Sequence, residues 1–179
     1  MQFVKTAIEG LIIIEPRVFK DDRGYFFESY SKAEFERNGL HYDFVQDNQS
    51  FSAYGTIRGL HFQKGASAQA KLVRCIAGRV LDVAVDLRPG SPTYGKHASV
   101  ELDTESHRMF MVPRGFAHGF SVLSETAIFA YKCDNLYDRA SEGGLLWNDP
   151  ALGIDWKIPE AKALLSEKDK VNPTLKEIS

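Results

Sequence analysis

The sequence predicts a mainly β protein, folded as a β-barrel of jelly-roll type with a few short helices. Two observations lead to this fold class. Many short segments show strand-like patterns, and turn-forming residues recur between them. The chain has 179 residues, which is enough for one well-formed core and too few for two comfortable domains. We therefore expect residues 1–179 to form a single domain.

The segment 80–87 shows the strand pattern most clearly. One face would carry Leu81, Val83, Val85 and Leu87, and the other Val80, Asp82, Ala84 and Asp86. This period of two, with β-branched residues, is typical of a strand. Gly78 precedes the segment and a proline- and glycine-rich turn follows it at 88–92. If the second face lines the barrel, Asp82 is placed to pair with Lys71; otherwise it faces solvent, and the sequence leaves both arrangements open.

Nine further segments are predicted to be strands. They are residues 10–15, 25–30, 44–50, 57–63, 71–77, 97–102, 108–112, 119–123 and 127–134. Two short helices are expected as well. The first would begin at Ser31 with a capping box to Glu34 and end at Gly39, and the second would span residues 159–165 with a proline at its start. Barrels of this kind often cover exposed strand edges with a second subunit, so we expect a homodimer.

Composition excludes several classes of partner. The formal net charge is −2, so no global positive field favours nucleic acid or an acidic membrane. Apolar runs such as residues 11–14 are far too short to cross a bilayer, and no secretory signal opens the sequence. A cytoplasmic protein is expected, and an anionic small ligand would need a local basic cluster.

Two segments rich in glycine and histidine, residues 55–63 and 113–119, resemble the paired motifs of the cupin superfamily. In metal-binding cupins the first motif supplies two histidines and a glutamate. Here Gln63 stands at the second histidine position and Lys71 at the glutamate position. A protonated lysine cannot bind a metal, and transition-metal sites need three or four ligands. We therefore expect neither a metal nor another cofactor.

The two remaining motif histidines, His61 and His118, have two interpretations. Each is compatible with an ordinary core or loop position. The nearby cations Arg58 and Lys71 favour a pocket for an anionic substrate instead.

Eight segments in order resemble the dTDP-4-dehydrorhamnose 3,5-epimerase family. They are residues 22–28, 44–48, 58–61, 71–74, 83–88, 113–120, 141–150 and 165–169. Together they span nearly the whole chain, from about residue 14 to residue 169. The resemblance implies a metal-free cupin whose substrate is a dTDP-4-keto-6-deoxyhexose. The implied reaction converts dTDP-4-dehydro-6-deoxy-D-glucose to dTDP-4-dehydro-L-rhamnose by inverting C3 and C5, in the route to dTDP-L-rhamnose.

The resemblance also implies catalytic roles for four residues. His61 would be the base, Asp169 would orient it, Tyr131 would be the acid, and Lys71 would face the enolate oxygen. Such chemistry needs a base, an acid on the opposite face, and a donor at the developing oxyanion. The local sequence alone favours a solvated charge for Asp169 and a packing role for Tyr131, so these two assignments depend on the family match.

Substrate binding is assigned in the same way. The matching positions are Arg23, Glu28, Gln46, Asn48, Arg58, Lys71, His118, Tyr137, Glu142 and Lys168. His118 is expected near the ketone, and Tyr137 is expected to stack on thymine. A surface-loop tyrosine is the less favoured alternative for Tyr137.

Three other functions remain open from the sequence. A 3- or 5-monoepimerase of another deoxysugar pathway would share His61, Tyr131 and Lys71. A non-catalytic cupin that binds a sugar nucleotide would not need a base and an acid. A metal-dependent cupin enzyme conflicts with Gln63 and Lys71.

Overall fold

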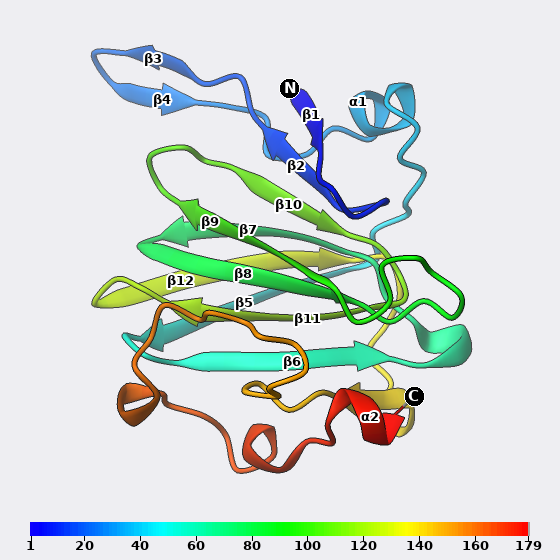
Figure 1. The fold of residues 1–179 in the computed structure, drawn as a ribbon. Helices are drawn as coiled ribbons and strands as arrows, with labels where there is room; N and C mark the ends of the chain where they lie inside the picture. The colour runs from blue at the N-terminus through cyan, green and yellow to red at the C-terminus, as the bar shows by residue number, and fades with distance from the viewer. Residues whose placement is uncertain (179) are drawn as a thin grey trace.

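Two antiparallel sheets packed face to face form the body of the protein in the computed structural model, which describes residues 1–178 (Figure 1). The six-stranded sheet has the order β1-β2-β10-β7-β12-β5, and the five-stranded sheet has the order β13-β6-β11-β8-β9. The six-stranded sheet consists of β1 (Gln2–Lys5), β2 (Ile12–Glu15), β10 (Met109–Val112), β7 (Lys71–Ala77), β12 (Thr126–Cys133) and β5 (Gln46–Ala53). The five-stranded sheet consists of β13 (Glu142–Gly144), β6 (Ile57–Gln63), β11 (Phe116–Val122), β8 (Arg79–Asp86) and β9 (His97–Asp103).

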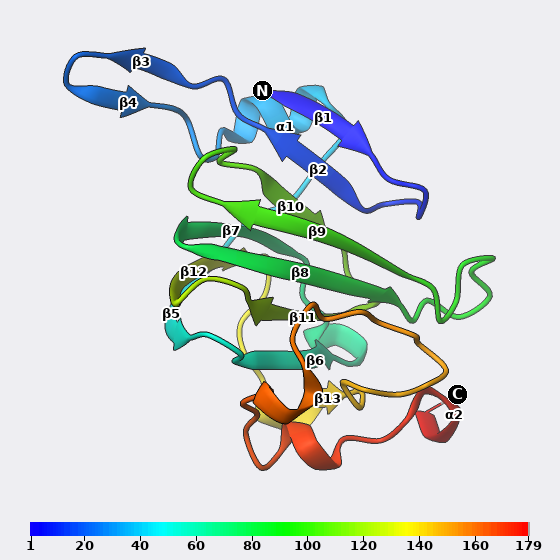
Figure 2. The ribbon, with the colours of Figure 1, turned by 60° about the vertical axis from the view of Figure 1, so that its left-hand side comes forward.

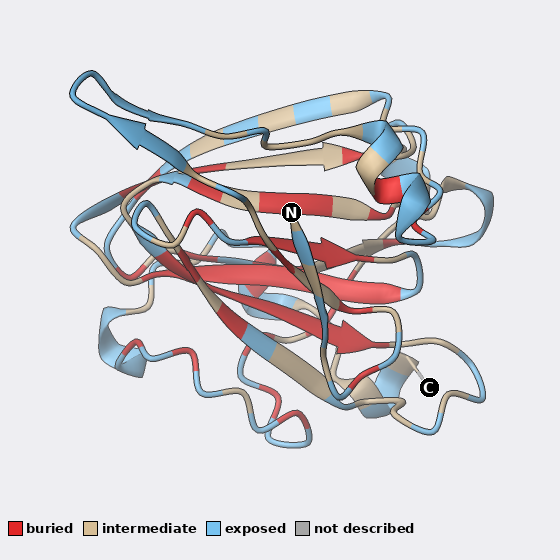
Figure 3. Cartoon of the chain, turned by 90° about the horizontal axis from the view of Figure 1, so that it is seen from above, coloured by how far each residue is buried: buried red, intermediate tan, exposed pale blue. Residues whose placement is uncertain are grey.

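The main core lies between the two sheets. Val73, Phe110 and Phe129 reach it from the six-stranded sheet, and Ala84 and Phe120 reach it from the five-stranded sheet. Their burial removes apolar surface from water and holds the sheets together. Figure 3 shows the buried residues concentrated on the strands. The larger cleft of the candidate site reaches this core, since Phe120 and Phe129 line it.

Two chain segments cover the outer faces of the sheets. The C-terminal segment packs Leu145, Trp147 and Trp156 against the five-stranded sheet. It contains the 3₁₀ turns η3 (Glu160–Lys162) and η4 (Asp169–Val171) and ends in helix α2 (Leu175–Ile178). Helix α1 (Lys32–Arg37) places Phe35 against the far side of the six-stranded sheet. The C-terminal segment runs alongside β6 in Figures 1 and 2, which brings η4 close to the cleft.

A two-stranded hairpin, β3 (Phe19–Asp21) with β4 (Gly24–Phe26), projects away from both sheets (Figures 1 and 2). We call residues 19–28 the arm. Its large aromatic side chains Phe19, Tyr25 and Phe26 are exposed. Exposed aromatic residues close together on one element are typical of a surface that contacts another molecule.

The predicted fold class is confirmed: the protein is mainly β, with a jelly-roll arrangement and few short helices. Strands 57–63 and 71–77 have the predicted bounds. The predicted strand 25–30 is mostly wrong, because the ladder ends at Phe26. Strands β1, β3 and β13 were not predicted, and all three are only three or four residues long.

The predicted helix over residues 159–165 is wrong, and only the turn η3 forms there. Leu164 instead accepts a hydrogen bond from the Ile57 amide and donates one to the Gly55 carbonyl. These bonds to the start of β6 hold the segment extended. Helix α1 does begin after Ser31, but the capping box is absent, since the Ser31 side chain makes no capping bond and Glu34 pairs with Arg37.

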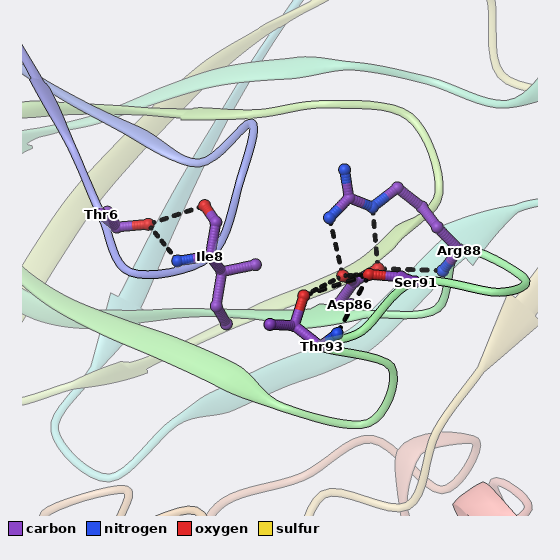
Figure 4. Close-up of polar contacts among 6 residues, drawn as sticks. All are labelled: Thr6, Ile8, Asp86, Arg88, Ser91 and Thr93. Atoms are coloured by element: carbon purple, nitrogen blue, oxygen red, sulfur yellow. Dashed lines mark hydrogen bonds and ion pairs between the residues drawn. The ribbon is translucent and has the colours of Figure 1, made fainter.

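Asp86 closes the loop between β8 and β9. Its buried carboxylate accepts hydrogen bonds from the Arg88 backbone and guanidinium, the Ser91 hydroxyl and the Thr93 hydroxyl, at 2.6–3.0 Å (Figure 4). Burial alone would raise the pKa of Asp86, but these bonds outweigh it and hold the pKa well below its usual value. Asp86 therefore has a structural role at the end of β8.

Replacing Asp86 with asparagine is expected to lower the free energy of unfolding by about 2–3 kcal/mol at pH 7, because charge-assisted hydrogen bonds are lost. The folded pKa lies below the unfolded value, so the unfolded chain takes up the proton first as the pH falls. The stabilisation is complete above about pH 5 and is lost progressively below about pH 4. Urea unfolding at pH 7 and pH 3 checks this: the difference in unfolding free energy between wild type and variant is smaller at pH 3. Glu125→Gln, at an exposed carboxylate, is the control.

Candidate active site

A cleft of about 590 Å³ opens between the two sheets. A second, smaller cleft of about 270 Å³ continues from it, since the two share Asn48, His61, Lys71 and Tyr131 in their linings. Phe120 and Phe129 form an apolar part of the larger cleft. Most of the other lining residues are polar or charged, and a concave site where such groups converge is a candidate small-molecule site.

His61 on β6 is paired with Asp169 of η4, 108 positions later in the chain. His61 Nε2 lies 2.5 Å from Asp169 Oδ1. Asp169 is buried, and burial would raise its pKa, but hydrogen bonding to His61 and the charge of that ring outweigh this and lower it. An ionised Asp169 accepts the proton of Nε2, which leaves Nδ1 as the ring nitrogen with a free lone pair. The pair is thus a base with a fixed tautomer.

A second histidine–carboxylate pair lies deeper in the same sheet. His118 Nε2 on β11 lies 3.0 and 2.9 Å from the two carboxylate oxygens of Asp82 on β8. Asp82 is 0% exposed, so its side chain faces the interior and not the solvent. Burial raises the pKa of Asp82, while the neighbouring His118 and the positive charge of Lys71 lower it in part. Because His118 lines the cleft, its remaining ring nitrogen is the one left for a ligand.

Lys71 and Tyr131 face these histidines from the other sheet. Lys71 begins β7 and Tyr131 lies on β12, with the Lys71 ammonium 5.8 Å from the centroid of the Tyr131 ring. Burial lowers the pKa of Lys71 and raises the pKa of Tyr131. Tyr131 therefore keeps its proton at neutral pH, and the ammonium lies beside the ring on which a phenolate would form.

The smaller cleft gathers residues suited to a nucleotide. Tyr137 lies on its wall and is 56% exposed. Its hydroxyl donates to Glu142 and its backbone amide donates to the side-chain oxygen of Gln46, both at 3.2 Å. Lys168 pairs with Glu142 at 2.5 Å. This cleft therefore offers an exposed aromatic ring beside paired charges.

The two clefts collect all but two of the sequence-predicted site residues. They are Gln46, Asn48, Arg58, His61, Lys71, His118, Tyr131, Tyr137, Glu142, Lys168 and Asp169. The exceptions are Arg23 and Glu28, which are exposed on the arm and line neither cleft. Arg23 pairs instead with Asp21 at 2.6 Å.

The sequence interpretation missed three contributors. Asp82 was left undecided, although a charge on a face shared with Val80 and Ala84 was a usable signal of an interior role. Ser166 accepts from the Asp169 backbone amide through its hydroxyl at 3.1 Å, which fixes the turn that presents the carboxylate. Gln63 was noted only as a lost metal ligand, and its contacts are described below.

Within residues 1–178, no group of three or more His, Cys, Asp and Glu side chains is close enough to hold a metal ion. The same residues contain no helix long and apolar enough to span a membrane. Fold and clefts together are those of a cupin-type isomerase, with a histidine–carboxylate pair and a tyrosine lining one cleft from two sheets.

Comparison with known proteins identifies the family. Residues 5–177 match the family model of dTDP-4-dehydrorhamnose 3,5-epimerase. The chain belongs to this family. A relative of that name from Salmonella typhimurium is 52% identical over 179 residues, covering 98% of this chain and 96% of the relative.

Solved structures agree with this assignment. A crystal structure of dTDP-4-dehydrorhamnose 3,5-epimerase from Elizabethkingia anophelis is 59% identical, with a TM-score of 0.95, and covers 99% of this chain and 97% of that chain. A dTDP-6-deoxy-D-glucose-3,5-epimerase from Legionella pneumophila, in complex with dTDP-4-keto-L-rhamnose, is 46% identical with a TM-score of 0.95 and coverage of 99% and 94%.

Proposed function

We propose that this protein converts dTDP-4-dehydro-6-deoxy-D-glucose to dTDP-4-dehydro-L-rhamnose by inverting C3 and C5, a step in dTDP-L-rhamnose biosynthesis. One observation carries the proposal: the His61–Asp169 pair and the Lys71–Tyr131 pair face a single cleft from opposite sheets. Inversion at a carbon next to a ketone needs such an arrangement, because the proton leaves from one face and returns to the other.

The mechanism follows from the positions of the groups. His61 Nδ1 removes the proton from the substrate carbon, and Asp169 stabilises the imidazolium that forms. The electron pair moves to the C4 oxygen and gives an enolate, to which Lys71 and His118 donate. Tyr131 then gives its proton to the same carbon from the opposite face. The imidazolium of His61 then releases its proton to solvent and the phenolate of Tyr131 takes one up, and the same steps follow at the second carbon after the ring reorients.

We propose that the reaction uses no metal or other cofactor. Two positions that carry metal ligands in other cupins hold Lys71, a cation, and Gln63, whose amide is bonded to the backbone. Tyr137, on the wall of the smaller cleft, is assigned to the thymine. Arg58 and Lys168, which line the larger cleft, are assigned to the diphosphate. Arginine suits this role because its guanidinium can hold a phosphate by two hydrogen bonds.

We propose further that the chain acts as one domain over residues 1–179, in the cytoplasm, as a homodimer. Arg23 and Glu28 support the dimer, because they match substrate-binding positions of the family and yet lie on the arm outside their own cleft. The exposed aromatic residues of the arm give it an apolar surface to pack on a second subunit. A partner's arm that reaches the cleft would bring both residues to the substrate.

Proton NMR of dTDP-4-keto-6-deoxyglucose with the protein in D₂O and EDTA tests the proposed reaction. We expect deuterium at both C3 and C5 and a product of the L-lyxo configuration. Deuterium at one carbon would make the protein a monoepimerase with the same acid–base mechanism. No exchange at either carbon, with nucleotide bound, would make it a binding protein. Loss of activity in EDTA, restored by a metal, would contradict the metal-free mechanism.

A further inference from the structure

Gln63, the last residue of β6, is a buried amide between two loops. It is 8% exposed. Its Nε2 donates to the Ser67 carbonyl at 2.6 Å and to the Leu136 carbonyl at 3.2 Å, and its Oε1 accepts from the Asp138 backbone amide at 2.7 Å. Both protons of the amide are therefore used, and every partner is a backbone group of another segment.

Two of these partners flank Tyr137 directly. Leu136 precedes it and Asp138 follows it, so Gln63 holds the backbone on both sides of the tyrosine. The Asp138 carboxylate strengthens the attachment by accepting from Ser67 Oγ at 2.8 Å and from Ser141 Oγ at 2.5 Å. The loop of residues 134–138 is thus fastened to the 3₁₀ turn η1 (Gly65–Ser67) and to the end of β6.

The exposure of Tyr137 makes this attachment relevant to binding. More than half of the side chain is accessible, at 56%, so packing alone does not fix the ring. Its direction depends on the hydroxyl bond to Glu142 at one end and on the backbone of its loop at the other. A ligand that stacks on a ring already in place loses less conformational entropy on binding than one that must order the loop.

We propose that Gln63 is a positioning residue for nucleotide binding, which acts by holding the Tyr137 loop ready for the base. At the position where other cupins place a metal ligand, this chain has an amide that orients a base-stacking residue. The proposal rests on the proposed function, in which Tyr137 stacks on thymine. It predicts an effect on nucleotide affinity and little effect on the chemical step.

Gln63→Met, which keeps the length of the side chain and removes its hydrogen bonds, tests the proposal. Calorimetric titration with dTDP is expected to show affinity weakened about 5- to 20-fold, since three backbone groups lose their partner. The value of kcat at saturating substrate is expected to stay within about threefold of wild type. Gln2→Met, the same substitution on the exposed strand β1, is the matched control and leaves both values unchanged.

A double-mutant cycle with Tyr137→Ala separates positioning from general destabilisation. Tyr137→Ala alone is expected to weaken dTDP binding about 5- to 150-fold, the range for losing one stacked base. In that background, adding Gln63→Met changes affinity by less than about twofold, because the residue it positions is gone. Additive losses would overturn the proposal. Unchanged binding by Tyr137→Ala would contradict the stacking in the proposed function itself, whereas an effect of Tyr137→Ala without one of Gln63→Met overturns the positioning role alone.

Gln63→Glu gives a second readout with a side chain of the same size. Its carboxylate still accepts from the Asp138 amide, but it places an acceptor against the Ser67 and Leu136 carbonyls. Burial against two carbonyl oxygens raises the pKa of the new carboxyl above its ordinary value, and protonation restores one donor. The ratio of variant to wild-type Kd for dTDP is therefore expected to fall toward one between pH 8 and pH 5. A ratio that is constant over this range would count against the proposal. The phosphate of dTDP also titrates in this range, but it affects wild type and variant alike, so its effect cancels in the ratio.

Discussion

Replacing His61 with alanine is expected to lower kcat by about 10²–10⁴-fold, the usual contribution of a general base. The structure gives the physical reason. Asp169 accepts the Nε2 proton at 2.5 Å and thereby leaves the Nδ1 lone pair available to the substrate. Alanine removes that lone pair. Affinity for dTDP is expected to change little, because nucleotide binding is proposed for Tyr137, Arg58 and Lys168 and not for His61.

The measurement is single-turnover conversion, together with deuterium exchange into recovered substrate, and both are expected to fall together. Asp169→Asn keeps the side-chain volume but loses the negative charge that stabilises the imidazolium. Its kcat is therefore also expected to be lower than that of the wild type. The double variant is expected to be no slower than His61→Ala alone, because the two residues act as a unit. His41→Ala, at an exposed histidine, serves as the control. Near-wild-type turnover by His61→Ala would exclude His61 as the base.

The strands that carry the site were predictable because their side chains alternate between two buried faces. Strand β8 is the clearest case: Val83 packs under the C-terminal segment and Ala84 packs into the core between the sheets. Shorter elements were not predictable in this way. The helix expected at 159–165 failed because its backbone bonds to β6, a contact that local propensity does not contain.

The pair His61–Asp169, proposed as the base and its partner, could not be predicted from local sequence either. His61 stands out by its motif, but Asp169 lies in a charged run that is typical of a solvated surface. It becomes buried only because η4 packs on β6, more than a hundred positions away in the chain. The pairing of His61 with Asp169 could be predicted from the family resemblance and not from the local sequence pattern. For Arg23 and Glu28 the resemblance implies substrate binding, but both residues lie outside the clefts of their own chain.

Replacing Tyr131 with phenylalanine is expected to slow product formation by about 10²-fold or more while exchange with solvent continues. His61 still removes the substrate proton in this variant, and Lys71 still stabilises the enolate. Without the phenol, the proton returns only from the side of His61, so the carbon regains its original configuration. Proton NMR in D₂O should therefore show deuterium in recovered substrate at a rate well above that of product formation. His61→Ala loses both processes, so the ratio of exchange to inversion distinguishes the two roles.

Tyr42→Phe is the matched control for this result. Burial raises the pKa of Tyr42 as it does that of Tyr131, but Tyr42 packs beside Phe44 and lies outside the linings of both clefts. The variant Tyr42→Phe loses a phenolic oxygen as Tyr131→Phe does, but it is expected to keep wild-type rates of exchange and inversion. If Tyr131→Phe loses exchange and inversion equally, Tyr131 takes part in forming the enolate and not in returning the proton. Since a phenol on the sheet opposite His61 can reach only the opposite face of the substrate, exchange without inversion is the result that this geometry requires.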